Sequence, residues 1–179
     1  MNPPKTIETL RLRLRQPIMD DAAAIFERYA TDPDVTKYLA WRPHENLEVT
    51  KNFLNWCFSV WEKGSNFPYV ITLKEDNQHQ PIGTIEIRIN RHRAEVGYAL
   101  AKAYWGQGYM TETAQAVLDW ILKQNEIFRV SAYCDVENIA SARVLEKVEM
   151  QREGILRRWG IHPNISQEPR DVYVYSKVK

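Results

Sequence analysis

The segment YWGQGYMTETAQAVLDW, residues 104–120, places two glycines one residue apart directly before an amphipathic helix. Gly106 and Gly108 can adopt positive φ and let a ligand reach the main chain, because they carry no Cβ. The first amides of the helix have no intrahelical partner and lie at the positive end of its dipole. This chemistry suits a phosphate or pyrophosphate, although a tight strand-to-helix turn without a ligand explains the glycines equally well.

Two familiar phosphate-binding motifs are excluded by the residues that follow. A P-loop needs Lys and then Ser or Thr after its last glycine, whereas Gly108 is followed by Tyr109 and Met110. The dinucleotide fingerprint needs a third glycine where Thr111 stands. We therefore expect a phosphate-bearing ligand that is held mainly by main-chain groups.

The strand that we expect at Ala94–Leu100 leads into this loop and carries a carboxylate. Because side chains alternate along a strand, Glu95, Gly97 and Ala99 share one face. Two such small residues leave room for a closely packed helix or for a thin ligand along the sheet. The carboxylate favours the ligand, since a buried carboxylate without a partner is costly and one beside a substrate can accept a proton.

Two glutamates are therefore candidates for a general base. Glu95 is the first, and Glu86, on the preceding expected strand, is the substitute. Each also has a plainer interpretation. Glu95 fits a surface ion pair with an arginine such as Arg88 or Arg91, worth roughly 1 kcal/mol or less. Glu86 fits an ordinary polar sheet face.

Hydrophobic periodicity supplies the elements that position these residues. Leu10, Leu12 and Leu14 alternate with arginines and indicate a strand, and Asp20 offers an N-cap to the next helix. In a helix from about Glu48 to Glu62, the inward stripe is expected to be Val49, Phe53, Trp56, Cys57 and Val60, with Gly64 ending the helix. The other elements are strands near Tyr69–Leu73, Ile82–Ile89, Ala94–Leu100, Val130–Asp135, Gly154–Trp159 and Val172–Val178, a helix after the glycine loop through Leu122, and a helix from about Ile139 to Glu149.

The order β-α-α-β-β-β-α-β-α-β-β predicts a single α/β domain over residues 1–179. In it, four helices flank a mixed, mostly antiparallel central sheet of about seven strands.

The histidines His44, His79, His92 and His162 are scattered, so we expect solvated loop residues and no metal site.

Charge and cysteine content limit the class of protein. With 24 Lys and Arg against 23 Asp and Glu, the chain does not look like a nucleic-acid-binding protein. Cys57 and Cys134 lie in apolar segments and indicate reduced core thiols. Residues 1–10 show no apolar signal segment and no run approaches a membrane span, so we expect a cytoplasmic protein without membrane partners. Monomer and homodimer both stay open.

Together these features resemble the GCN5-related N-acetyltransferase (GNAT) superfamily, and within it the RimJ/RimL type that acetylates ribosomal proteins. The resemblance covers nearly the whole chain, through LRLRLRQPIMDDA, AEVGYALAKAYWGQGYMTETA, DVENIASARVLEKVEMQREGILRRW and DVYVYS. It implies transfer of acetyl from acetyl-coenzyme A to a primary amine, on a protein N-terminus or a small molecule, by direct attack in a ternary complex. The alternative is a non-catalytic acyl-coenzyme A sensor or regulatory module.

The resemblance also implies which residues hold the coenzyme. The loop Ala103–Gly108 would cradle the pyrophosphate, and the strand Glu95–Leu100 would pair with the pantetheine amides. Asn138 would contact pantetheine and Ser141 would lie near the thiol and act in catalysis, although both residue types also cap helices well. The implied set is Tyr98, Ala99, Leu100, Ala103, Tyr104, Trp105, Gly106, Gln107, Gly108, Tyr109, Met110, Thr111, Asn138 and Ser141.

Several positions depart from the family pattern. Ala103 stands where the family usually has Gln or Arg, which removes one polar anchor. Leu145 replaces a tyrosine that many relatives use as general acid, so that role falls to Ser141, to water or to nothing. Gly160 stands where RimL-type enzymes carry a glutamate implicated as the base, which favours Glu95 or a water relay.

The amine acceptor is expected to meet the least regular segments, Trp41–Leu47 and Ile161–Arg170. Trp41 is a candidate to line the acceptor pocket. Tyr173 and Tyr175, on one side of the last strand, are two more candidates.

Overall fold

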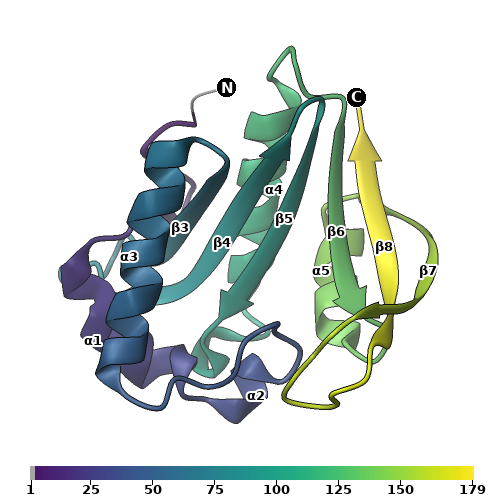
Figure 1. The fold of residues 1–179 in the computed structure, drawn as a ribbon. Coiled ribbons are helices and arrows are strands. Elements are labelled where there is room, and N and C mark those ends of the chain that lie inside the picture. Colours follow the sequence, from purple (N-terminus) through teal and green to yellow (C-terminus); the bar gives the residue numbers. More distant parts are fainter. Residues whose placement is uncertain (1–2) are drawn as a thin grey trace.

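A computed structural model describes residues 3–179, which form one continuous eight-stranded sheet with helices on both faces (Figure 1). The strand order is β1-β2-β3-β4-β5-β6-β8-β7. The strands are β1 (Thr6–Glu8), β2 (Leu12–Arg15), β3 (Asn66–Leu73), β4 (Pro81–Asn90), β5 (Arg93–Leu100), β6 (Arg129–Asp135), β7 (Gln151–Gly160) and β8 (Arg170–Val178). The α-helices are α1 (Ala22–Ile25), α2 (Pro33–Thr36), α3 (Leu47–Lys63), α4 (Tyr109–Leu122) and α5 (Ile139–Lys147).

The sheet is antiparallel at every pair of neighbouring strands except β5 and β6. The two predicted hairpins that join β3, β4 and β5 are confirmed, and so is the mixed, mostly antiparallel sheet. The sheet has eight strands rather than about seven, because β1 was not foreseen. It spans only three residues, too few for a periodicity to be recognised.

Helices α4 and α5 cover one face of the sheet, and α1 and α3 cover the other (Figure 1). Strand β5 contributes to both layers, since Val96 and Leu100 belong to the larger core under α4 and α5, whereas Ala99 belongs to the smaller core under α1 and α3. The predicted apolar face of α4 is confirmed by the burial of Met110, Ala114, Val117, Leu118 and Ile121.

The first predicted helix is wrong in its start and its regularity. A 3₁₀ turn (Met19–Asp21), α1, a π turn (Phe26–Ala30) and α2 take its place. Asp21, not Asp20, accepts a hydrogen bond at the start, from the Ile18 amide at 2.8 Å. Asp21 is buried because Arg15 of β2 pairs with it at 2.5 Å. Leu10 lies outside β2 and is 89% exposed, so the strand is shorter than its leucine pattern predicts.

The buried face of α3 is rotated relative to the predicted stripe. Thr50 and Leu54 are buried with Cys57 and Val60, whereas Val49 and Trp56 are exposed. The helix ends as predicted at Gly64, which has a φ of 70°. Helix α5 ends at Lys147, two residues earlier than expected, and Glu149 takes a left-handed φ of 62°.

Candidate functional site

The parallel strands β5 and β6 are paired over only three residues each, from Arg93 opposite Arg129 to Glu95 opposite Ser131. Farther along they diverge, although β5 stays paired with β4 and β6 with β8. The main-chain groups that face the gap therefore have no sheet partner. An extended, amide-bearing ligand is the kind of molecule that can pair with such groups.

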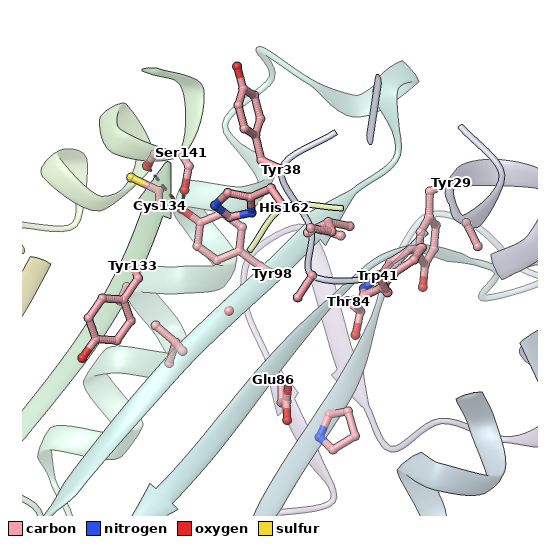
Figure 2. Close-up of a pocket in the computed structure, with 18 of the residues that line it drawn as sticks. Tyr29, Tyr38, Trp41, Thr84, Glu86, Tyr98, Tyr133, Cys134, Ser141 and His162 are labelled. Atoms are coloured by element: carbon pink, nitrogen blue, oxygen red, sulfur yellow. Dashed lines mark hydrogen bonds between the residues drawn. The ribbon is translucent and has the colours of Figure 1, made fainter. Parts of the chain in front are cut away.

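A cavity of about 280 Å³ lies at this divergence (Figure 2). Residues 96–99 of β5 and residues 132–134 of β6 form two of its walls. Asn138, Ser141 and Leu145 of α5 line it as well, and the segment 38–44, helix α3 and the β7–β8 loop cover it. The site thus combines strand edges with side chains from distant parts of the chain.

The glycine bend follows directly after β5. Gly106 and Gly108 have φ values of 74° and 81°, which confirms the predicted positive φ. A Cβ at Gly106 would meet no atom of the described residues 3–179 within 4 Å, so the bend faces open space. Within residues 3–179, the amides of Gly106, Gln107 and Gly108 donate no hydrogen bond. Free amides and the start of α4 therefore converge on a space that suits an anion.

Side chains at the bend turn back onto the protein rather than filling that space. The Trp105 indole N–H donates to the Leu100 carbonyl at 2.7 Å. The Gln107 amide group donates to the Ala103 carbonyl at 2.9 Å. These bonds fix the shape of the loop and leave its main chain accessible.

Arg11 is a residue of this bend that the sequence did not reveal. Its guanidinium donates to the Gln107 carbonyl at 3.1 Å and to the Glu112 carboxylate at 2.7 Å, and it lies over the Tyr109 ring at 4.3 Å. Its side chain is 41% exposed, so it can also meet an anion. Arg11 and Glu112 are 101 residues apart in sequence, which is why no local pattern predicts the contact.

Glu86 and Glu95 have different surroundings. Glu86 lines the cavity and accepts a hydrogen bond from Asn66 at 3.0 Å. Burial raises the pKa of Glu86 above its ordinary value, with Arg88 opposing and Glu95 reinforcing the shift. Glu95 lines a neighbouring hollow instead, is 38% exposed, and pairs with Arg88 at 3.0 Å. The geometry matches the plainer interpretation of Glu95, and its catalytic role stays a prediction.

The space above the small residues of β5 is used in two ways. The Arg88 guanidinium covers Gly97, where a Cβ would come within 2.9 Å of Nη2. Ala99 packs in the core under α1 and α3. The space over Gly97 is therefore occupied by a side chain of the neighbouring strand, which the sequence alone did not indicate.

Ser141 stands at the start of α5, where its hydroxyl lies 2.9 Å from the Tyr98 hydroxyl. Asn138 caps this helix by accepting from the Ser141 amide at 3.1 Å, so the capping role considered for it is present. Burial raises the pKa of the Tyr98 phenol. Leu145 is fully buried beside them. The Tyr98 hydroxyl thus lies near the start of α5, the helix in which Leu145 stands at the position where the family resemblance implies a tyrosine.

Aromatic side chains form the cover of the cavity. Trp41 lies there together with Phe53 and Trp56 of α3, and its contact with an acceptor stays a prediction. The expectation for Tyr173 and Tyr175 is wrong in its location. Tyr175 is fully buried in the core and donates to Glu146 at 2.9 Å, and Tyr173 packs against the Arg152 guanidinium at 4.7 Å.

The prediction that the histidines are solvated holds only for His92. His162 has a side chain only 12% exposed and lines the cavity, and His44 hydrogen-bonds the Thr50 hydroxyl at 2.8 Å. Burial lowers the pKa of His44. His79 is half-buried. Loop position alone gave no signal for the burial of His162, since it depends on segments that meet only in the folded chain.

Comparison with known proteins identifies the family. Residues 11–151 match the family model of the acetyltransferase (GNAT) domain. The chain belongs to the GNAT family. Its relatives include the uncharacterized N-acetyltransferase YoaA of Bacillus subtilis, which is 30% identical over 97% of this chain and 96% of its own length. YnaD of the same species, also named an N-acetyltransferase, is 35% identical over 85% of this chain and 86% of its own length.

Solved structures agree with this GNAT assignment. The GNAT-family acetyltransferase from Bacillus anthracis is 30% identical, has a TM-score of 0.82, and is matched over 97% of this chain and 98% of its own. RimL, a ribosomal α-N-protein acetyltransferase solved with coenzyme A, shares the fold with a TM-score of 0.84, 22% identity and 97% coverage of both chains.

Among residues 3–179, none of the helices has the length and hydrophobicity that a membrane span requires. No group of three or more His, Cys, Asp or Glu residues in the same range is arranged to hold a metal ion.

Proposed function

We propose that this GNAT protein transfers an acetyl group from acetyl-coenzyme A to a primary amine by direct attack. The observation that carries the proposal is the divergence of β5 from β6 beside a bend with free amides. These two features fit the two chemical parts of the coenzyme, an extended diamide arm and a pyrophosphate.

The coenzyme would lie along β5 and end at the glycine bend. Gly106 to Met110 would hold the pyrophosphate through main-chain amides, and the Arg11 guanidinium would add a positive charge. The free edge of β5 near Tyr98 would pair with the pantetheine amides. When bound, acetyl-coenzyme A supplies an acetyl thioester, whose carbonyl carbon is open to attack by an amine.

The acceptor would enter from the covered side of the cavity. Trp41 and Trp56 offer aromatic faces, which attract cations as well as apolar groups. Glu86 adds a carboxylate in the same cavity, so the cavity favours the binding of an ammonium group. Either a protein N-terminus or a small amine satisfies this chemistry, and the first is what the name of RimL states for that protein.

Each side chain then has a distinct task. Glu86 attracts and orients the ammonium group. Ser141, whose hydroxyl lies 2.9 Å from that of Tyr98, is the hydroxyl available to protonate the departing sulfur. Catalysis rests largely on holding the two reactants together, since a thiolate leaves readily.

The test has two parts. Calorimetry should detect coenzyme A binding to the purified chain. Acetyl-coenzyme A should then release free thiol in the presence of a panel that contains 2-phenylethylamine and tetrapeptides beginning with Ala or Ser. Mass spectrometry should find one added acetyl group on the amine nitrogen. Thiol release without any acetylated amine would contradict the proposal, and so would the absence of coenzyme binding.

Two variants separate the carboxylates. Glu86→Gln should lower kcat/KM for the amine about tenfold or more, with coenzyme affinity unchanged, because the ammonium loses its partner. Glu95→Gln tests the first candidate base directly, and a loss greater than that of Glu86→Gln would restore Glu95 to that role. Glu62→Gln, at an exposed position of α3, is the matched control.

A further inference from the structure

His162 lines the cavity from the segment expected to meet the acceptor, but the sequence gave this side chain no catalytic role. It lies in the β7–β8 loop and is 12% exposed. Both ring nitrogens are buried without a hydrogen-bond partner among residues 3–179. A buried polar atom without a partner costs about 1–3 kcal/mol, so such an atom in a native fold calls for a ligand or a function.

A buried carboxylate lies behind the ring. Asp135, at the end of β6, is fully buried, and its Oδ2 lies 3.6 Å from His162 Nε2. Arg170 donates to the same carboxylate at 2.6 Å. Although burial alone would raise the pKa of Asp135, hydrogen bonds from Arg170 and the Glu137 amide keep it below the ordinary value. Asp135 is therefore an anion beside Nε2 of His162, and although 3.6 Å is longer than a hydrogen bond, its charge favours a proton on that nitrogen.

The loop that carries His162 is fixed at both sides. The His162 carbonyl accepts hydrogen bonds from the amides of Ile165 at 2.9 Å and Ser166 at 3.0 Å. Asn164 donates to the carbonyls of Thr36 and Trp41, each at 2.7 Å. These hydrogen bonds of the β7–β8 loop therefore fix the position of the His162 ring.

The turn after β6 brings His162 and Ser141 to the same end of the cavity. Asp135 contacts His162, and its carbonyl accepts from the Asn138 amide at 2.9 Å. Asn138 in turn caps the helix that begins with Ser141. In the view of Figure 2, His162 is drawn over Tyr98 and toward Ser141 and Cys134, whereas Trp41 and Glu86 are drawn away from it.

We propose that His162, oriented by Asp135, is the catalytic residue that accepts the proton of the amine, and that Glu86 only attracts and orients the ammonium group. This rests on the proposed acetyl transfer. A carboxylate behind an imidazole fixes its tautomer and stabilises its protonated form, the arrangement that serves proton transfer in other enzymes. With a proton on Nε2, Nδ1 keeps a lone pair that no group of residues 3–179 uses.

The proposed acetyl transfer balances in protons and electrons. The ammonium group gives one proton to Nδ1 of His162 and becomes a neutral amine. Its lone pair forms the C–N bond to the acetyl carbon, the C–S bond breaks, and the sulfur keeps that electron pair. The second N–H proton ends on the sulfur through Ser141 or water. One proton per turnover therefore passes from His162 to solvent.

The decisive experiment is His162→Gln in the full chain, with 2-phenylethylamine as acceptor or, if it is not acetylated, the peptide of the panel that is. We expect kcat to fall about 100-fold or more with coenzyme A affinity unchanged, the usual size of a lost general base. His92→Gln, at an exposed hairpin tip, is the matched control. Retention of kcat within threefold in His162→Gln, while the unchanged chain transfers acetyl, would overturn this inference and leave the proposed function standing.

Two readouts separate proton transfer from a structural role. The kcat/KM of the unchanged chain should fall as pH is lowered, and His162→Gln should lose this dependence. The groups that face His162 are Asp135 of β6, Arg170 of β8 with its partner Glu137, and Tyr38 of the covering segment. In NMR spectra, adding coenzyme A and the amine should shift the imidazole signals of His162 and not those of His92. An unchanged His162 signal would count against the inference.

Discussion

The two sides of the cavity are built differently. On the coenzyme side, the groups that would bind are main-chain amides of the Gly106–Gly108 bend and the free edge of β5. On the acceptor side, they are side chains of Trp41, Glu86 and His162, which come from three separate segments. The coenzyme side therefore follows from local backbone conformation, whereas the acceptor side exists only when distant segments meet.

The largest effect is expected from Asp135→Asn. This change removes the charge that pairs with Arg170 and faces His162, and breaking such a buried pair costs about 3 kcal/mol. Urea unfolding should show this loss, while coenzyme A affinity, which rests on the main-chain side, stays within about twofold. Asp119→Asn, at an exposed site of α4, should change stability by less than about 0.5 kcal/mol. Equal loss of coenzyme affinity would show that the two sides are not independent.

Gly108→Ala tests the main-chain side. A Cβ at a φ of 81° costs about 1–2 kcal/mol in stability, and it should weaken coenzyme A binding about tenfold because the bend shifts. Gly64→Ala is a close control, since Gly64 also has a positive φ, of 70°, but ends α3 away from the bend. Calorimetry should find the loss of binding in the first variant alone. Similar binding in both variants would argue against a coenzyme site at the bend.

Trp41→Ala tests the side-chain side. Removing the indole should raise the amine KM about tenfold through lost aromatic contact, with coenzyme A affinity unchanged. Steady-state kinetics at saturating acetyl-coenzyme A provide the measurement. Trp159→Ala, which removes a tryptophan that is 62% exposed on β7, should leave this KM unaltered. A raised KM in the control, or none in Trp41→Ala, would remove Trp41 from the acceptor site.

The smallest effect is expected from Glu153→Gln, away from both sides. Hydrogen bonds from Arg129 and Ser176 lower the pKa of Glu153 from its ordinary value of 4.5 to about 2. A lowered carboxyl pKa stabilises the fold above the unfolded pKa, and this contribution is lost as pH falls from about 4.5 to 2. Because the side chain is 40% exposed, we expect at most about 1 kcal/mol at pH 7. At pH 7 the urea midpoint of the variant should lie below that of the unchanged chain. At pH 3 this difference between the two midpoints should be smaller.

The sequence predicted what depends on local rules. The glycine bend, the apolar face of α4 and the hairpins around β4 follow from φ preferences and periodicity, and the structure confirms them. It could not predict the burial of His162, because that depends on Asp135 and on the segment 38–44 packing against the β7–β8 loop. The choice between Glu86 and Glu95 likewise depends on where Arg88 lies, which periodicity does not encode.

The early separation of β5 from β6 has a consequence for the stability of the unliganded protein. In most sheets, the main-chain N–H and C=O groups without a partner lie on the edge strands. Here they lie inside the sheet, between β5 and β6, each of which pairs with another strand on its other side. Amide protons of residues 96–99 that face β6 should consequently exchange with deuterium faster than those facing β4. An occupant that bridges the two halves would protect them and raise the melting temperature, so heat resistance should report occupancy even where no turnover is measured.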